Sequence, residues 1–118
     1  MGPVPTEIRI RRGTNCLDVA FEDGVKFSLP AEYLRVESPS AEVQGHAPHQ
    51  KQLVSGKERV NIAAVEPIGN YAVRIRFDDG HDTGIYSWAL LAQLGREYGQ
   101  RWAAYLAALT ERGLRRTP

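Results

Sequence analysis

The sequence predicts an α+β domain in which a small, mainly antiparallel β-sheet is covered on one face by C-terminal helices. Apolar and polar residues alternate in short stretches before residue 80, residues 37–57 show little periodicity, and the last third carries apolar residues at helical spacing. A chain of 118 residues is typical of one domain. We expect this domain to span residues 1–112, followed by a flexible tail at 113–118 that has no apolar pattern.

The first three predicted strands form a meander. Ile8 and Ile10 alternate with charged residues, and a second alternation ends at Phe21. After the turn residues 22–24 (EDG), a third stretch continues through Phe27 to Leu29. Short neighbouring strands separated by a turn are expected to pair antiparallel.

A long loop is predicted to follow the meander. Pro30 suits the first position of a single helical turn, because its fixed φ is already close to the helical value. Residues 37–57 then contain the breakers Pro39, Gly45, Pro48 and Gly56. Structureless loops of this length inside compact domains are usually functional or disordered.

A central hairpin and two helices complete the prediction. Alternating apolar residues lie on both sides of a Gly69-Asn70 turn, and the second strand ends at Asp79-Gly80. Ser87 is a candidate cap for a helix that Gly95 is expected to end. A second helix carries an apolar stripe made of Tyr98, Trp102, Tyr105, Leu106 and Leu109, which we interpret as core in preference to a partner groove.

Composition limits the possible functions. Fifteen basic and fourteen acidic residues give a net charge of +1, so no net charge favours nucleic acid or an anionic membrane. No apolar run approaches the ~20 residues needed to span a bilayer, and residues 1–5 (MGPVP) do not resemble a signal peptide. The lone cysteine, Cys16, is interpreted as a small buried apolar group. We therefore expect a cytoplasmic protein.

Two tracts carry a family resemblance. Residues 34–46 (LRVESPSAEVQGH) are followed about forty residues later by residues 77–81 (FDDGH). The pair resembles the gamma-butyrobetaine hydroxylase N-terminal-like domain family. Zinc-bearing members of that family place Cys-x-Cys-x-x-Cys after a Leu-Arg pair, and a histidine after a hairpin. The resemblance runs from about Ile8 to Leu94 and implies a standalone binding or accessory domain. Relatives are appended to 2-oxoglutarate-dependent hydroxylases and to ATPases that handle iron-sulfur clusters.

The resemblance also implies where zinc would bind, and the residues argue against it. The three cysteine positions fall on Ser38, Ser40 and Val43, while the histidine is retained as His81. Structural zinc normally takes four thiolate, imidazole or carboxylate ligands, and neither serine hydroxyls nor valine replace thiolates. We expect no cofactor and a fold that forms without zinc. His81 is then either exposed or a polar anchor that bonds the loop across the space that zinc fills in relatives.

Other sites remain possible. His46, His49 and His81 together could hold a transition metal, although loop histidines are more often solvated. Asp78, Asp79 and Asp82 could form half of a calcium or acid-base site, but turns also select Asp and Gly. The binding residues that we expect are Ser38, Ser40, Gln44, His46, His49 and His81.

Catalysis and nucleic-acid binding are not expected. Ser38 or Ser40 could act as a nucleophile with His81 as base and a neighbouring aspartate as its partner, but no Gly-x-Ser-x-Gly elbow is present. These serines are better explained as caps or backbone partners. If the first strand and the Phe77 strand share a sheet, Arg9, Arg11, Arg74 and Arg76 would form one basic face.

The sequence thus predicts a non-catalytic binding or accessory module with a protein partner. The alternative is a metal or iron-sulfur cluster assembly accessory protein that uses His81 and the loop histidines.

Overall fold

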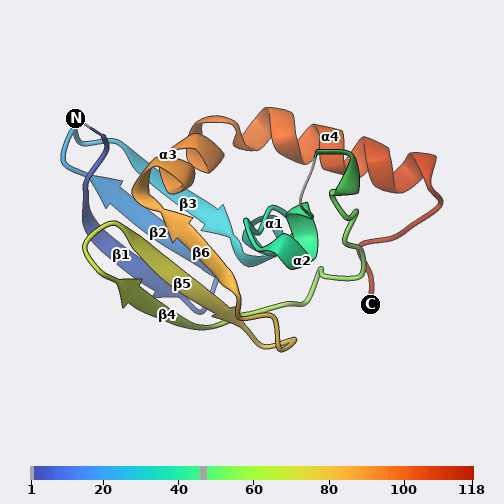
Figure 1. The fold of residues 1–118 in the computed structure, drawn as a ribbon, viewed down its shortest axis with the longest axis horizontal. Coiled ribbons are helices and arrows are strands. Elements are labelled where there is room, and N and C mark those ends of the chain that lie inside the picture. Colours follow the sequence, from blue (N-terminus) through green and yellow to red (C-terminus); the bar gives the residue numbers. More distant parts are fainter. Residues whose placement is uncertain (1, 46–47) are drawn as a thin grey trace.

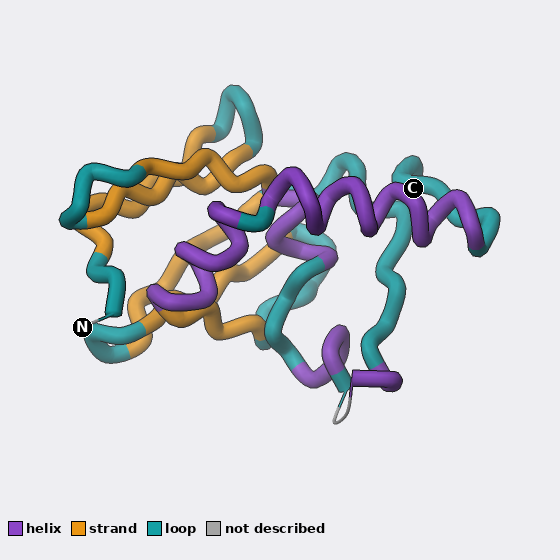
Figure 2. Tube along the Cα trace, turned by 90° about the horizontal axis from the view of Figure 1, so that it is seen from above, coloured by secondary structure: helices purple, strands orange, loops and turns teal. Residues whose placement is uncertain are grey.

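The computed structural model describes residues 2–45 and 48–118. Within them, six strands form two antiparallel three-stranded sheets, which lie as two layers with the helices along one side (Figures 1 and 2). The first sheet has the order β1 (Pro5–Arg11), β2 (Cys16–Phe21), β3 (Lys26–Pro30), and the second has the order β4 (Ile62–Ile68), β5 (Ala72–Phe77), β6 (Gly84–Ser87). The α+β class is confirmed, with the strands divided between two sheets instead of one.

Alternation explains the strands, and shortness explains the one strand that the sequence prediction omitted. Leu17, Val19 and Phe21 of β2 are buried, while the residues between them are partly exposed. β6 was not predicted, because it has only four residues. It completes the second sheet by pairing with β5.

In the part of the chain that the structure describes, five helical segments connect and cover the sheets. They are α1 (Ala31–Val36), α2 (Ala41–Gln44), the 3-10 turn η1 (Pro48–Gln50), α3 (Trp88–Arg96) and α4 (Tyr98–Glu111). Residues 37–57 are therefore not structureless, since α2 and η1 lie within them. The predicted cap at Ser87 is confirmed, because its hydroxyl accepts a hydrogen bond from Leu90 N at 3.1 Å.

Gly95 does not end α3, which continues to Arg96. Its role is close packing: a Cβ at this position would lie 2.4 Å from the Phe27 ring on β3. The glycine thus lets α3 approach the first sheet. α3 contacts both β3 and β6, so it covers one edge of each sheet.

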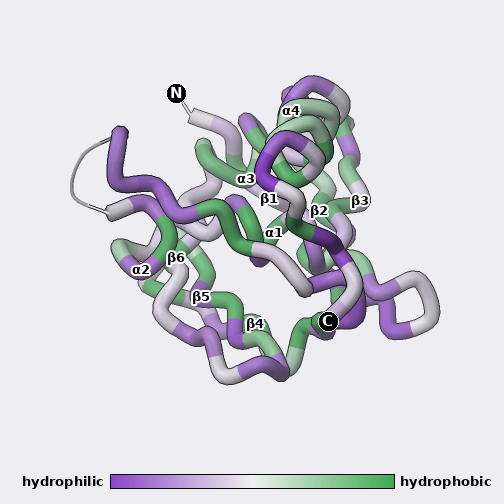
Figure 3. Tube along the Cα trace, turned by 90° about the vertical axis from the view of Figure 1, so that its right-hand side faces the viewer, coloured by the Kyte–Doolittle hydropathy of each residue, from purple (hydrophilic) through white to green (hydrophobic). Residues whose placement is uncertain are grey.

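The main core lies between the two sheets, α1 and α3. Figure 3 shows β4 and β5 as largely hydrophobic segments joined by hydrophilic loops. A smaller apolar cluster of Val36, Tyr105 and Leu109 joins α1 to α4. Most of the predicted stripe on α4 contributes to packing, but Leu106 is 37% exposed, so its assignment to the core was wrong.

The C-terminal segment makes defined contacts. Arg116 Nη2 donates to Glu32 Oε1 at 2.7 Å, and its guanidinium lies 5.4 Å from the centre of the Trp102 ring. Gly56 N and Glu58 N also donate to carbonyl oxygens of this segment. The mobility expected for residues 113–118 stays a prediction. In the described part of the chain, no helix combines the length and apolar character required to cross a membrane.

Candidate functional site

The site lies between the C-terminal end of α1 and the turn that connects β5 to β6. α1 brings the chain to Ser38 and Ser40, and the turn after β5 brings His81 beneath them. Gly84 permits this approach, because a Cβ there would lie 2.7 Å from Ser38 Oγ. Ser38 is 0% exposed and His81 is 5% exposed. The two family-implied positions therefore meet inside the molecule.

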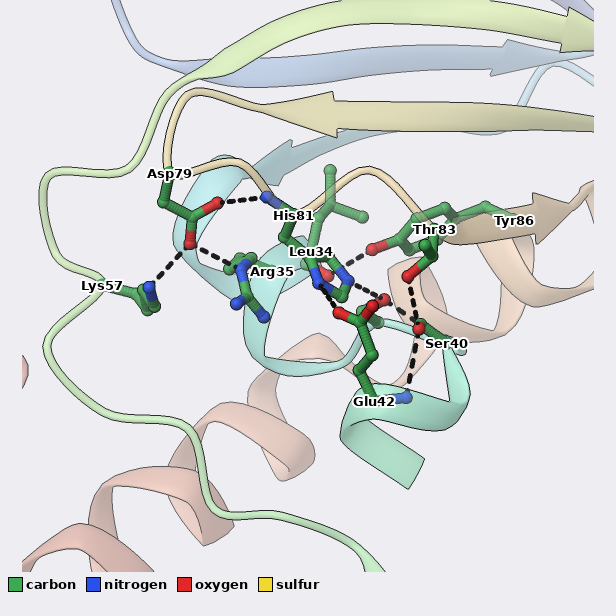
Figure 4. Close-up of polar contacts among 10 residues, drawn as sticks. Leu34, Arg35, Ser40, Glu42, Lys57, Asp79, His81, Thr83 and Tyr86 are labelled. Carbon is green, nitrogen blue, oxygen red and sulfur yellow. Dashed lines mark hydrogen bonds and ion pairs between the residues drawn. The ribbon is translucent and has the colours of Figure 1, made fainter. Parts of the chain in front are cut away.

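A hydrogen-bond network joins Ser38, His81 and Glu42 (Figure 4). Ser38 Oγ lies 2.8 Å from His81 Nε2, and Glu42 Oε2 lies 3.0 Å from His81 Nδ1. An ionised carboxylate can only accept, so Nδ1 carries the proton and Nε2 accepts from the Ser38 hydroxyl. This arrangement matches the polar-anchor interpretation of His81.

Burial favours the neutral imidazole. Loss of hydration is the main cause that lowers the pKa of His81, and the Arg35 charge lowers it further. Glu42 acts in the opposite direction. The balance keeps the pKa below its usual value, which fits a neutral anchor.

The neighbouring polar residues fix the backbone of the segment. Ser40 Oγ caps α2 by accepting from Glu42 N at 3.2 Å and contacts Thr83 Oγ1 at 2.6 Å. Gln44 Nε2 donates to Ser38 O at 2.8 Å. Ser40 thus caps a helix, as the sequence suggested, and both serines also bond residues of the turn between β5 and β6.

Asp79 forms the second polar centre. Its Oδ1 accepts from His81 N at 3.1 Å, while its Oδ2 accepts from Lys57 Nζ at 2.7 Å and from Arg35 Nε at 2.8 Å. Burial opposes ionisation of Asp79, but these donors outweigh it and lower the pKa to about 2. The turn aspartate therefore shapes the hairpin and ties it to α1 and to residue 57.

Asp78, which precedes Asp79 in the same turn, also bonds the backbone. Asp78 Oδ1 accepts from Asn61 N at 2.9 Å. Among the described residues, no three His, Cys, Asp or Glu side chains are grouped so that they could hold a metal ion. His49 is exposed, and His46 lies outside the described residues. The described residues therefore form no metal site that combines His49 with His81.

The donor set at the family's zinc position does not fit zinc. Val43 has no donor atom, and Ser38 and Ser40 supply neutral hydroxyls. Ser38 Oγ and His81 Nε2 bond directly to each other, so the two groups already satisfy one another.

Ser38, His81 and Glu42 have the connectivity of a Ser-His-acid triad, but not its accessibility. The carboxylate on Nδ1 is Glu42, whereas the sequence pointed to Asp78, Asp79 or Asp82. Glu42 and Thr83 gave no sequence signal, because only the tertiary arrangement brings them to the hairpin. A nucleophile must contact its substrate, and Ser38 is fully covered.

The proposed arginine face does not form as one sheet surface. β1 and β5 belong to different sheets. Arg9 pairs with Glu7, Arg11 with Asp18, and Arg74 with Glu66. The acidic partners offset the positive charge at these positions.

A cleft lies between residues 51–54 and α4. It has a volume of about 300 Å³, and its apolar lining includes Val36, Leu53, Val54, Ala104 and Ala108. Tyr105 Oη donates to Val54 O at 2.7 Å, which holds the segment against α4.

A polar rim borders this cleft. Glu37 Oε2 accepts from Arg101 Nη1 at 2.9 Å and from Lys51 Nζ at 3.3 Å. Burial raises the pKa of the Tyr105 hydroxyl to about 12, so it stays protonated and remains a donor. The cleft therefore combines an apolar floor with a charged border.

Fold and site together define a small α+β domain with a polar anchor formed by Ser38 and His81. The sequence profile of the gamma-butyrobetaine hydroxylase-like N-terminal family matches residues 8–92, close to the span inferred from the sequence. The chain belongs to this family. None of the curated proteins compared with it matches.

Solved structures agree with this assignment. Two proteins with solution NMR structures are 42% and 46% identical, with TM-scores of 0.86 and 0.85. The alignments cover 100% and 98% of this chain and 93% and 86% of those chains. A DUF971-family protein of unknown function from Acidithiobacillus ferrooxidans ATCC 23270 is 41% identical over 77% of this chain and 91% of its own, with a TM-score of 0.66.

Proposed function

We propose that this chain is a non-catalytic accessory module of the cytoplasm that binds a protein partner through the cleft between residues 51–54 and α4. The buried Ser38–His81 pair carries the proposal. Ser38 and His81 are buried and bonded to each other, so they serve as an internal support and not as an exposed reactive group. The half-buried single Cys16 suits a reducing compartment.

The hydrogen bonds around His81 and the lining of the cleft both involve residues of the stretch 37–57. His81 holds the beginning of residues 37–57, whereas Tyr105 and Glu37 hold its later part against α4. A surface that is fixed before binding loses less conformational entropy when a partner docks. An apolar floor with a polar border is also the usual organisation of a protein interface.

The test compares two faces of α4 with identical changes. Ala104→Glu with Ala108→Glu places charges in the cleft, while Ala103→Glu with Ala107→Glu places them at exposed positions outside its lining. Proteins recovered from an extract of the source cells are identified by mass spectrometry, and the purified partner is titrated by calorimetry. We expect the cleft variant to weaken binding by about tenfold or more, because buried charges without partners oppose association.

Two results would contradict this function. Equal binding by the two variants would remove the cleft assignment. Failure of the unmodified chain to bind any purified candidate would remove the protein-binding function itself. Arg74→Glu with Arg76→Glu provides a third arm, since loss of binding there would move the interface to the second sheet.

The alternative function, a metal or iron-sulfur accessory protein, has a separate test. Metal analysis of the untagged protein is combined with melting curves in the presence and absence of chelator. We expect no stoichiometric metal and an unchanged melting temperature. Ser38→Cys, Ser40→Cys and Val43→Cys combined restore the thiolate positions that the family resemblance implies, and this variant serves as the zinc-binding positive control.

A further inference from the structure

The two sheets have one covered side and one uncovered side. α3 packs against the edge strands β3 and β6, whereas β1 and β4 are the opposite edge strands of the two sheets (Figure 1). A groove of about 640 Å³ runs between β1 and the second sheet. Arg12, which follows β1, donates to the carbonyl oxygens of Ile62 and Ala63 and so joins the two sheets.

The groove has an apolar floor. Its lining includes Ile8 and Ile10 from β1, and Val65, Val73 and Trp88 from the opposite side. Ile8 and Ile10 pack against the main core but remain only partly buried. Apolar residues at a free sheet edge favour addition of another strand.

The register shows that β1 also offers backbone groups at this edge. Phe21 N donates to Val25 O, which lies on the β3 side of β2. Backbone groups of successive residues point to opposite sides of a strand, so the N–H and C=O of Val19, two residues earlier, also point toward β3. Ile8 pairs with Val19, and it therefore directs its own N–H and C=O away from β2. The same alternation applies to Ile10.

β1 is complementary to itself. In an antiparallel pair centred on Ile8, Glu7 of one copy faces Arg9 of the other, and this contact occurs twice. Glu7 and Arg9 side chains are 58% and 60% exposed, so both can reach a neighbouring strand. Ile8 faces its own copy on the groove side, and the register shift between Pro5 and Glu7 ends the regular pairing before Glu7. Opposite charges and apolar pairs at directly opposed positions are favourable across antiparallel strands.

We propose that β1 is a dimerisation strand, and that its partner is β1 of a second copy of this chain. The two three-stranded sheets that contain β1 then form one continuous six-stranded sheet about a two-fold axis at Ile8. The isoleucines of the second copy cover the groove of the first. This surface is separate from the cleft at α4 and does not depend on the proposed function.

Charge exchange tests the dimer. The full-length protein and its variants are examined by analytical ultracentrifugation over a wide concentration range. Glu7→Arg gathers four positive charges at the two-fold axis, and Arg9→Glu gathers four negative ones. We expect each single variant to raise the dimer dissociation constant by about tenfold or more, because like charges brought together oppose association. Melting temperatures should stay close to that of the unmodified chain, since both side chains are exposed.

Rescue makes the test specific. An equimolar mixture of Glu7→Arg and Arg9→Glu chains should form a heterodimer, because every facing pair again has opposite charges. The double variant Glu7→Arg with Arg9→Glu should recover the homodimer for the same reason. A chain that is monomeric at all concentrations would overturn the proposal. It would also fail if the single variants dimerise normally, or if the mixture shows no recovery.

Discussion

Two neighbouring parts of this domain are held by different chemistry. Between the sheets, buried aliphatic and aromatic side chains pack against α1 and α3. Beyond α1, residues 38–44 are held by directed hydrogen bonds to His81 and Thr83. Apolar packing is spread over many contacts, whereas a buried hydrogen-bond network depends on each partner being present.

The difference predicts how the two parts respond to substitution. The loss of stability caused by a substitution in the apolar part should scale with the side-chain volume that is removed. The loss of stability caused by a substitution in the polar part should depend on which buried group is left without a hydrogen bond. Single variants and one double-mutant cycle can separate these two behaviours.

The largest effect is expected at Trp102. Its ring centre lies 5.1 Å from that of Tyr105 and 6.3 Å from that of Tyr33, so it joins α4 to both apolar clusters. Trp102→Ala should reduce the free energy of unfolding by about 3 kcal/mol, as large-to-small core changes do. Leu106→Ala, one turn further on the exposed side, should cost less than about 1 kcal/mol. Urea unfolding measures both, and similar losses would contradict the assignment of the core.

A smaller effect with strong coupling is expected in the polar anchor. His81→Ala should reduce stability by about 2 kcal/mol, because it removes a buried side chain and leaves the buried Ser38 hydroxyl without its acceptor. Ser38→Ala should cost about 1 kcal/mol. The double variant should lose less than the sum of the two, since both changes remove the same bond.

The same unfolding experiment provides the control. His49→Ala changes an exposed histidine and should alter stability by no more than about 0.5 kcal/mol. Strict additivity of the His81 and Ser38 changes would mean that the network does not act as a unit.

The apolar part was largely predictable from sequence. Period-two alternation identified five of the six strands, and the helical stripe identified most of the packing face of α4. The failures have local causes. β6 is too short for a pattern, and Gly95 stays inside α3 because the Phe27 ring occupies the space beside it.

The polar part was predictable only in outline. Ser38, Ser40 and His81 were located through the family resemblance, whereas Glu42 and Thr83 were missed. Hydrogen bonds across thirty-nine or forty-three residues depend on how α2 is placed over the hairpin, and no periodicity encodes that placement. The division into two sheets is likewise a tertiary property, since alternation marks strands but not their partners.

The smallest effect is a pH dependence that should be specific to the polar anchor. Burial, helped by Arg35, lowers the pKa of His81 in the folded state below its ordinary value of 6.5. The unfolded chain therefore binds the proton more readily, so stability from this group is complete above pH 6.5 and decreases as the pH falls. Asp79 also has a lowered pKa, of about 2 against 3.8, so its contribution is lost only in a more acidic range.

Urea unfolding between pH 8 and pH 5 should thus give a declining free energy of unfolding for the unmodified chain. His81→Gln keeps a polar side chain but cannot titrate, so its curve should decline less over the same range. An NMR titration of the His81 ring should place its midpoint below 6.5. Parallel unfolding curves for the two proteins, or a midpoint above 6.5, would show that His81 is not the neutral buried anchor that its contacts with Ser38 and Glu42 indicate.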